Sequence, residues 1–405
     1  MTERLPSDNH SAAVQPASSA PLWLLALITL SGTMAMHIFA PALPDVARDL
    51  DVPSSVVQLT LSTYIAGLAI GQLTYGPISD RYGRRPVLVA GMILYLIASI
   101  AAFLSSDIVL MLVARFIQAI GGCAGLVLGR AIVRDTSAGY QAARRLSLMN
   151  LMTMAGPGLS PLIGAVLVSL TGWRSIFAFV SIAGFLNLIL ILALVPNAGG
   201  TGGQDMRTVM RNYLALIKSV RFLGLTIGGG FTTTAPYSFI AAAPFIFTGE
   251  LHQPPESVGL YLALNVVGLW LGSLTTSRLI GKLAPIRIIT LGTGISFVSA
   301  IVFLGFAVSG SLSVAATIVP VVVFSYGAGA ASPVALAEAM NINPAMAGSA
   351  SGLYGFAQMA VGATCSALSG LGPDPALAVA LILVTAGIIS QSCFWLAKSL
   401  TPRET

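Results

Sequence analysis

Charged residues are scarce in this chain of 405 residues. Only 8% of its residues are Asp, Glu, Lys or Arg, and 56% are hydrophobic. A soluble domain carries about 25% charged residues, so this scarcity excludes an ordinary soluble protein. Apolar runs of about 20 residues recur along the chain, which is the length needed to cross ~30 Å of hydrocarbon. The composition therefore predicts an integral membrane protein.

Cysteine is also rare, and its spacing carries no metal or disulfide pattern. Cys123, Cys365 and Cys393 all lie in apolar segments without a CxxC pair. Neither a disulfide framework nor a zinc site is indicated. We expect all three to be buried packing residues, and we expect no metal site.

The sequence lacks the motifs of ATP-driven pumps and of common hydrolases. No GxxxxGK[ST] loop is present to cradle a phosphate, so ATP is not the expected energy source. The three histidines, His10, His37 and His252, form no HExxH motif or nucleophile–base pair. We therefore expect neither an enzyme nor a cofactor. Lys and Arg outnumber Asp and Glu by 20 to 14, but they lie in short loops and not on one soluble face, so no nucleic-acid partner is expected.

Twelve apolar windows predict an all-α membrane protein of twelve transmembrane helices. The longest connection, 196–219, opens with the flexible sequence PNAGGTGGQD and divides the chain into two six-helix bundles, 21–195 and 220–398, with tails at 1–20 and 399–405. The predicted windows are 21–43, 56–75, 86–104, 108–130, 146–169, 174–195, 221–247, 257–278, 287–308, 312–336, 347–369 and 375–397.

The basic residues predict which side of the membrane each loop faces. With both termini in the cytoplasm, 17 of the 20 Lys and Arg residues fall on the cytoplasmic side, as the positive-inside rule requires. The opposite orientation inverts that ratio. The tails and the central connection are therefore predicted to be cytoplasmic.

One cytoplasmic turn is highly charged. GPISDRYGRRP, residues 76–86, has an aspartate and three arginines, and its Gly83 permits the positive φ of a tight turn. The equivalent place in the second half reads SRLIGKLAP, residues 277–285, where Gly281 and Lys282 correspond to Gly83 and Arg84. Transporters are often built from such repeated halves, with the substrate site between them.

GPISDRYGRRP resembles the loop signature of the major facilitator superfamily, and two further segments resemble other motifs of that family. RFIQAIGG (115–122) is similar to the family's fourth-helix motif, and AGPGLSPLIG (155–164) to the fifth-helix motif of its antiporters. The Bcr/CflA subfamily of drug:proton antiporters is resembled more closely, through IFAPALPDVARDL (38–50), GRAIVRD (129–135), GWRSIF (172–177), FTTTAPYSFIAAAPF (231–245) and AGSASGLYGFAQ (347–358).

The resemblance implies a proton-coupled exporter of small drugs of the bicyclomycin, phenicol or sulfonamide type. It would work by alternating access in a bacterial inner membrane, as a monomer, with the proton gradient as its energy source. One position departs from the subfamily, which often has an aspartate in the first helix where this chain has His37. The alternatives are a sugar or metabolite exporter of the same fold and a non-transporting receptor or channel.

By the same resemblance, the charged turn is a conformational latch. Asp80 would contact the start of the eleventh helix, and Arg84 would pair with Asp135 at the inner end of the fourth, with Gly83 shaping the turn. The latch would close the cytoplasmic side in the outward-facing state. The alternative is that these charges only fix the topology.

Titratable residues inside the windows are the candidates for proton coupling. His37 is the one deep side chain whose unperturbed pKa, ~6.5, lies in a useful range, and Arg115 resembles the family arginine linked to coupling. His37 could instead only satisfy a neighbouring polar group, and Arg115 could extend to the outer surface. Asp135 and Asp45, at helix ends, are the alternative proton carriers, with Asp80 less favoured.

The remaining candidates concern substrate contact and a bend. Gly156, Pro157, Pro161 and Gly164 would bend the fifth helix, and the resemblance adds a seal against proton leak; a permanent kink is the alternative. A drug site is mostly apolar with a few polar groups, and each candidate for it could instead be a helix-packing hydrogen bond. With carboxylates absent from the windows, neutral or anionic substrates are favoured over multivalent cations, and the expected drugs are neutral or amphipathic. The candidates are His37, Tyr64, Gln118, Tyr237, Asn265 and Gln358.

Overall fold

The computed structural model describes residues 20–137, 139–197 and 206–399. Throughout these ranges the chain is helical, apart from turns and one isolated bridge between Ile280 and Leu283. The all-α prediction is confirmed. The predicted tails, other than Ala20 and Ser399, and part of the central connection lie outside the described residues.

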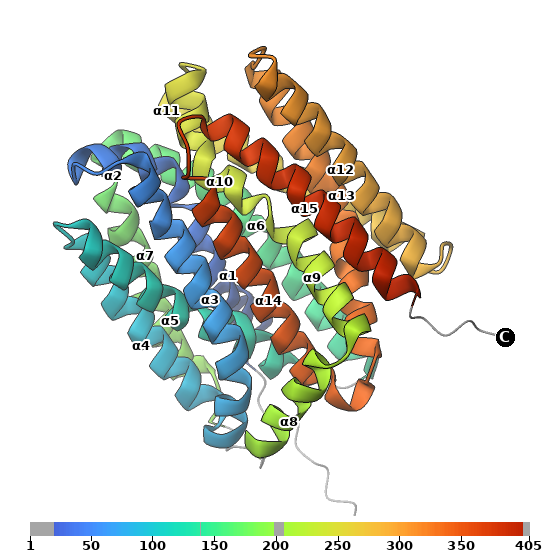
Figure 1. The fold of residues 1–405 in the computed structure, drawn as a ribbon. Coiled ribbons are helices and arrows are strands. Elements are labelled where there is room, and N and C mark those ends of the chain that lie inside the picture. The colour runs from blue at the N-terminus through green and yellow to red at the C-terminus, as the bar shows by residue number, and fades with distance from the viewer. Residues whose placement is uncertain (1–19, 138, 198–205, 400–405) are drawn as a thin grey trace, which may run out of the picture.

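The first half of the chain forms one bundle (Figure 1). Its fourth long helix, α5, packs against α1, α3 and α4, and α7 also packs against α4. The elements are α1 (Leu22–His37), the 3₁₀ turn η1 (Ala40–Ala42), α2 (Leu43–Asp49), α3 (Ser54–Tyr82), α4 (Arg84–Phe103), α5 (Ile108–Asp135), α6 (Gly139–Thr171) and α7 (Arg174–Leu194).

The second half forms the other bundle, joined to the first through the short helix α8 (Met206–Ile217). Here α13 packs against α11, α12 and α9, and α15 packs against α9 and α12. The elements are α9 (Val220–Thr234), α10 (Tyr237–Phe245), the π-helix η2 (Ile246–Glu250), α11 (Pro255–Leu279), α12 (Pro285–Val308), α13 (Val314–Asn341), the 3₁₀ turn η3 (Pro344–Met346), α14 (Ala347–Leu368) and α15 (Pro375–Ser399).

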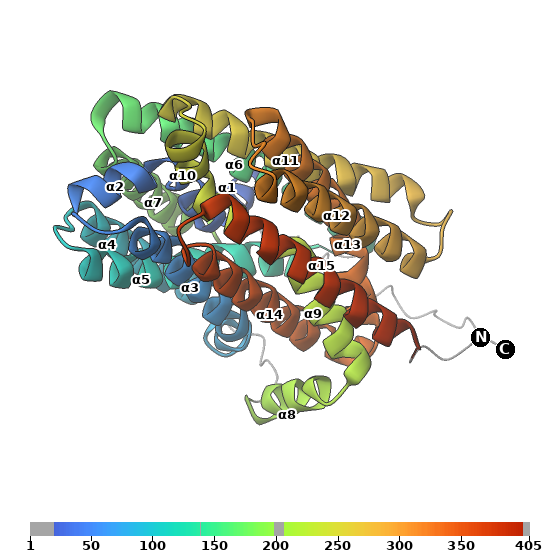
Figure 2. The same ribbon diagram turned by 45° about the horizontal axis from the view of Figure 1, so that its top comes forward.

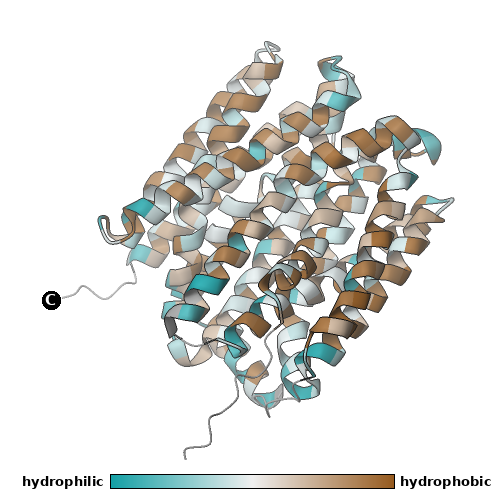
Figure 3. Ribbon diagram, turned by 180° about the vertical axis from the view of Figure 1, so that it is seen from behind, coloured by the Kyte–Doolittle hydropathy of each residue, from teal (hydrophilic) through white to brown (hydrophobic). Residues whose placement is uncertain are grey.

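Each predicted window overlaps a helix or a broken helix. In the described ranges ten helices are long and apolar enough to cross a membrane, or up to eleven if the pair Arg207–Ile217 and Val220–Glu250, bent by 84°, is one span. Helix α14, which corresponds to the window 347–369, is not among these ten helices. It is rich in glycine and serine. Large apolar side chains are exposed in both bundles, and Figure 3 shows ribbons coloured as hydrophobic along most of the helices, as expected for surfaces that meet lipid.

Local sequence explains where helices begin and end. Asp107 caps α5 by accepting a hydrogen bond from the Leu110 N–H at 2.9 Å, as N-cap residues do. Gly83 ends α3 with φ 93°, and Gly281 follows α11 with φ 83°. These are the two corresponding glycines of the repeated halves, and both have the positive φ that glycine permits.

Glycines bring helix backbones of the first bundle into contact. A Cβ on Gly122 of α5 would lie 2.9 Å from the Gly32 Cα of α1, and a Cβ on Gly125 would meet the Ile28 carbonyl oxygen. Small residues allow this approach, which compensates for the weak hydrophobic drive between helices in lipid. The α1–α5 pair is therefore closely fixed.

The two bundles meet along two seams and at one end. Helix α3 runs beside α14, and α6 beside α11, while η1 and α2 contact α10 (Figure 2). Ser62 donates to the Ser366 hydroxyl at 3.1 Å, and the Ser369 hydroxyl donates to Gln58 Oε1 at 3.1 Å. Toward the opposite end, Gln72 lies against Gly355 of α14. The α3–α14 seam thus carries polar side chains at both of these places.

Candidate functional site

His37 lies where the two bundles meet. It is the last residue of α1 and only 6% exposed, and its Nδ1 lies 2.8 Å from the Thr33 carbonyl oxygen. A carbonyl can only accept, so Nδ1 carries a hydrogen and Nε2 of the neutral ring is left as an acceptor. The His37 ring meets the Tyr237 ring edge-on, with centroids 6.4 Å apart and planes at 79°.

Tyr237 begins α10 directly after Pro236, where the seventh predicted span breaks. Its ring packs against α14, since a Cβ on Gly362 would lie 2.7 Å from Tyr237 Cδ2. One turn earlier on α14, the Gln358 carbonyl accepts a hydrogen bond from Thr234 Oγ1 at 2.8 Å. The structure therefore brings His37, Tyr237 and the α14 segment that contains Gln358 into one neighbourhood.

Arg115 is completely buried inside the first bundle. Its Nη1 donates to the Ala35 carbonyl at 3.1 Å and to Gln118 Oε1 at 2.7 Å. Its guanidinium carbon lies 4.1 Å from the Tyr64 ring centroid, with the rings of Phe39 and Phe177 at 4.8 and 5.8 Å. Aromatic faces thus surround the cation.

Tyr64 and Gln118 belong to this internal network. The Tyr64 hydroxyl donates to the Gly32 carbonyl at 2.6 Å, and Gln118 Nε2 donates to Ser99 Oγ at 2.8 Å. Nε and Nη2 of Arg115 are buried and have no hydrogen-bond partner among the described residues. Asn265 is likewise bonded within one bundle, to Ser325 of α13. The polar groups of Tyr64, Gln118 and Asn265 are therefore bonded within their own bundles and not to His37.

The charged turn forms a compact ion cluster at one end of the first bundle. Arg84, the first residue of α4, pairs with Asp80 of α3 at 2.5 Å and with Asp135 of α5 at 2.8 Å. It also donates to Ser79 Oγ. The cluster therefore joins three helices of the same bundle. Contact between Asp80 and the eleventh helix stays a prediction.

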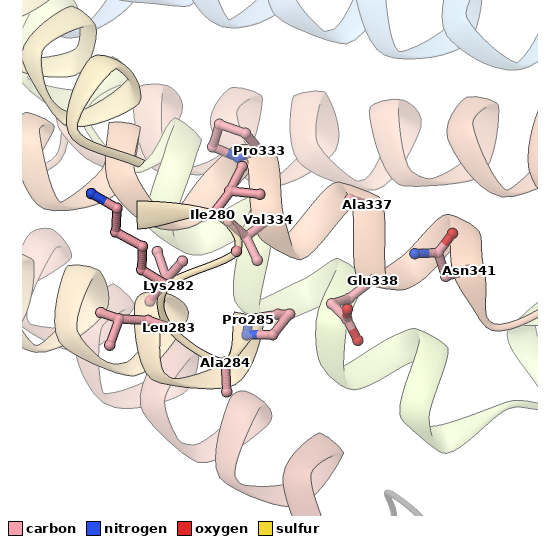
Figure 4. Close-up of a pocket in the computed structure, with 12 residues that line it drawn as sticks. Ile280, Lys282, Leu283, Ala284, Pro285, Pro333, Val334, Ala337, Glu338 and Asn341 are labelled. Carbon is pink, nitrogen blue, oxygen red and sulfur yellow. The ribbon is translucent and has the colours of Figure 1, made fainter. Parts of the chain in front are cut away.

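The equivalent end of the second bundle is hollow. A pocket of about 600 Å³ lies between the Gly281 turn and α13, and Lys282, Glu338 and Asn341 are its polar lining residues (Figure 4). Glu338 pairs with Arg221 of α9 at 3.5 Å. Because the lining comes from one bundle only, this pocket is separate from the seam at His37. In the described ranges no three His, Cys, Asp or Glu side chains gather as metal ligands.

Helix α6 runs between α1 and the other bundle. Pro157 and Pro161 lie within it. On one side, Gly156 packs on Leu30 and Gly164 on the Ile38 carbonyl oxygen, both in the α1 region. On the other side, a Cβ on Gly259 of α11 would lie 2.6 Å from the Pro161 carbonyl oxygen. The Gly-Pro segment is thus in the α6–α11 seam.

Sequence reasoning missed the polar pairs of the α3–α14 seam. Gln58, Ser62 and Gln72 are polar residues within one predicted span, which was the available signal, but each also fits ordinary helix packing. Phe39 and Phe177 were missed because nothing in the sequence places them beside Arg115.

The chain is similar in sequence to known transport proteins. Residues 25–366 match the sequence profile of the Major Facilitator Superfamily. The chain is 27% identical over 354 residues to the bicyclomycin resistance protein homolog of Haemophilus influenzae, which covers 85% of this chain and 87% of that protein. It is 28% identical over 389 residues to multidrug resistance protein D of Escherichia coli, covering 93% and 94% respectively.

The fold is also similar to that of a solved transporter. The crystal structure of the D-xylose-proton symporter superposes with a TM-score of 0.73 at 15% identity, over 91% of this chain and 96% of that one. At this identity the likeness concerns the fold alone.

Proposed function

This chain belongs to the major facilitator superfamily, among its Bcr/CflA drug-efflux members, and on this premise we propose that it exports small drugs in exchange for protons. The transporter lies in a bacterial inner membrane with both termini in the cytoplasm, as the basic loops favour. The observation that carries the proposal is the contact between His37 of one bundle and Tyr237 of the other. Transport in this fold requires the bundles to separate and rejoin around such a place.

Proton exchange follows from the chemistry of the His37 ring. Its Nδ1 is held by Thr33, so Nε2 accepts a hydrogen bond when the ring is neutral and becomes a donor when it is protonated. A drug hydroxyl or amide N–H that donates to Nε2 binds only the neutral ring. Proton and drug then oppose each other, which is the requirement for exchange.

Arg115 supports His37 from within the first bundle. It holds the carbonyl of Ala35, two residues before His37 on α1. This hydrogen bond fixes the end of α1, on which His37 lies. We assign it a positioning role and not drug contact.

Drug contact is assigned to the His37, Tyr237 and Gln358 neighbourhood. All twelve predicted windows lack Asp and Glu, so the site suits neutral or amphipathic drugs of the bicyclomycin, phenicol or sulfonamide type. Tyr237 supplies an aromatic face, as small-molecule sites commonly do. The Gly-Pro segment of α6 lies at the neighbouring seam, where Gly259 of α11 lets the two helices approach closely.

The Arg84 cluster acts as the latch. Its side chains are only partly exposed, at 18% for Arg84 and 37% for Asp135, and such charge pairs can serve as elements with two discrete arrangements. In this structure Asp80 and Asp135 both pair with Arg84. In the other arrangement the Asp80 side chain turns to the start of α14.

The experiment is drug uptake into inverted membrane vesicles with an imposed pH difference, alongside drug binding to purified protein. The wild type should accumulate drug only when the vesicle interior is acidic. His37→Ala should bind drug more weakly and with an affinity that no longer changes with pH, and its uptake should lose the response to the pH difference. Unchanged exchange in His37→Ala would transfer the proton role to Asp135 or Asp45, and wild-type drug flux that ignores the pH difference would refute proton coupling itself.

A further inference from the structure

The connecting helix α8 has a position unlike that of the membrane-spanning helices. Its axis is bent by 84° from that of Val220–Glu250, which corresponds to the seventh span. It therefore crosses one end of the molecule nearly at right angles to that span (Figures 1 and 2), an orientation close to the plane of a membrane that the span crosses. A helix in this place lies at the level of the lipid headgroups if its surface permits.

One face of α8 is committed to the protein. Val209 and Leu216 are buried, and the Tyr213 hydroxyl donates to the Leu73 carbonyl of α3 at 3.2 Å. Helix α8 also packs against α14. It thus touches both sides of the α3–α14 seam.

A second face is apolar and exposed. Met210, Leu214 and Ile217 follow at i, i+4 and i+7, so they form one stripe, and all three are exposed. Exposed apolar side chains at membrane-interface depth are satisfied by the acyl boundary of the bilayer.

A third face is basic. Arg207, Arg211 and Lys218 follow at i, i+4 and i+11, are all exposed, and lie beside the apolar stripe on the helix surface. The sequence has no acidic residue from 206 to 249. This order of protein face, apolar stripe and basic stripe is the pattern of an interfacial helix that binds anionic lipid.

We propose that α8 binds anionic phospholipid headgroups, and that the bound lipid holds α8 against the α3–α14 seam. The basic stripe supplies charge complementarity to the phosphate and acidic headgroup, and the apolar stripe supplies contact with the acyl chains. A protein partner or a second copy of the chain would not need both stripes side by side.

The test is lipid binding to the purified full-length protein in neutral detergent. Phosphatidylglycerol and phosphatidylcholine are titrated separately, and bound lipid is measured by native mass spectrometry. The α8 triple variant carries three substitutions in the basic stripe, Arg207→Gln, Arg211→Gln and Lys218→Gln. The matched control combines Arg278→Gln, Arg287→Gln and Lys282→Gln, which remove the same charge from exposed residues of the second bundle.

We expect the wild type to bind phosphatidylglycerol about a hundredfold more tightly than phosphatidylcholine, because each of the three cations contributes about fivefold. The α8 triple variant should lose this preference, and the control triple should keep it. Equal loss in both triples, or a preserved preference in the α8 triple, would overturn the proposal. An unchanged elution profile and unfolding temperature show that each variant is folded.

A second measurement locates the lipid. Amide hydrogen exchange of residues 206–218 is compared in nanodiscs of phosphatidylcholine with and without phosphatidylglycerol. Slower exchange in this segment with phosphatidylglycerol supports the proposal. Protection that depends on protein concentration and not on lipid would assign the face to a second copy, and would overturn it. Neither measurement depends on transport, so the proposed function stands or fails separately.

Discussion

The Tyr64 ring is predicted to stabilise the buried charge of Arg115. The guanidinium carbon lies 4.1 Å from the ring centroid, and the Tyr64 hydroxyl separately donates to Gly32. Two substitutions divide these contributions. Tyr64→Phe removes the hydrogen bond and keeps the ring, whereas Tyr64→Leu removes both.

The magnitudes follow from the burial of the pair. A hydrogen bond between membrane helices is worth about 0.6 kcal/mol on average, so Tyr64→Phe should lower the free energy of unfolding by about that amount. A cation–π contact away from water is worth about 2 kcal/mol. Tyr64→Leu should therefore lower the free energy of unfolding by about 2 kcal/mol more than Tyr64→Phe does. The packing that leucine fails to replace adds to this loss.

A double-mutant cycle separates the cation–π energy from the packing. Unfolding is followed in mixed micelles by titration with a denaturing detergent, for Tyr64→Leu, Arg115→Met and the double variant. We expect a coupling free energy of about 2 kcal/mol, which is a factor of about 30 in the unfolding equilibrium constant. A coupling below about 0.5 kcal/mol would refute the reasoning, because the ring would then be a packing residue with no hold on the charge.

Three further outcomes are expected. Gly164→Ala should lower the free energy of unfolding by about 3 kcal/mol or prevent folding, because its Cβ would meet the Ile38 carbonyl oxygen. The control Gly158→Ala, on the same helix, has only Val266 at 3.8 Å and should be tolerated; unfolding temperature and expression yield compare the two variants. Asp135→Asn should change stability by less than about 1 kcal/mol, because the pair is partly exposed, yet lower vesicle transport several-fold; wild-type transport would leave these charges only a topology role. Ser62→Cys with Ser366→Cys, in a chain whose native cysteines are replaced, should cross-link under oxidation and stop transport until reduced; transport by the cross-linked protein would mean that this seam never opens.

The fold was predictable because length and apolarity suffice for membrane helices. A run of about 20 apolar residues has one stable backbone in lipid, and each window overlaps a helix, although the seventh is broken into α9, α10 and η2. The helix ends were less accurate: α3 continues to Tyr82, seven residues past its window, and α13 continues to Asn341. Apolarity marks the part of a helix inside hydrocarbon, whereas the helix itself extends into the headgroups and beyond.

The candidate site was only partly predictable. His37 and Arg115 stood out because ionisable residues in spans are rare, and both lie buried in the structure. The direction of each side chain was not readable, because helices that are apolar on all sides give no periodic signal of which face meets a neighbour. Tyr64 and Gln118 therefore looked equivalent to Tyr237 and Gln358, although the first two bond inside one bundle and the last two lie at the boundary.

The touching backbones of α1 and α5 have an evolutionary consequence. Where Gly122 meets Gly32 and Gly125 meets Ile28, no methyl group fits, so substitutions there are removed by selection whatever compound is exported. Inherited changes that broaden the range of tolerated antibiotics should accumulate instead around Tyr237 and on the α14 surface facing it. Resequencing of drug-challenged populations would find them there.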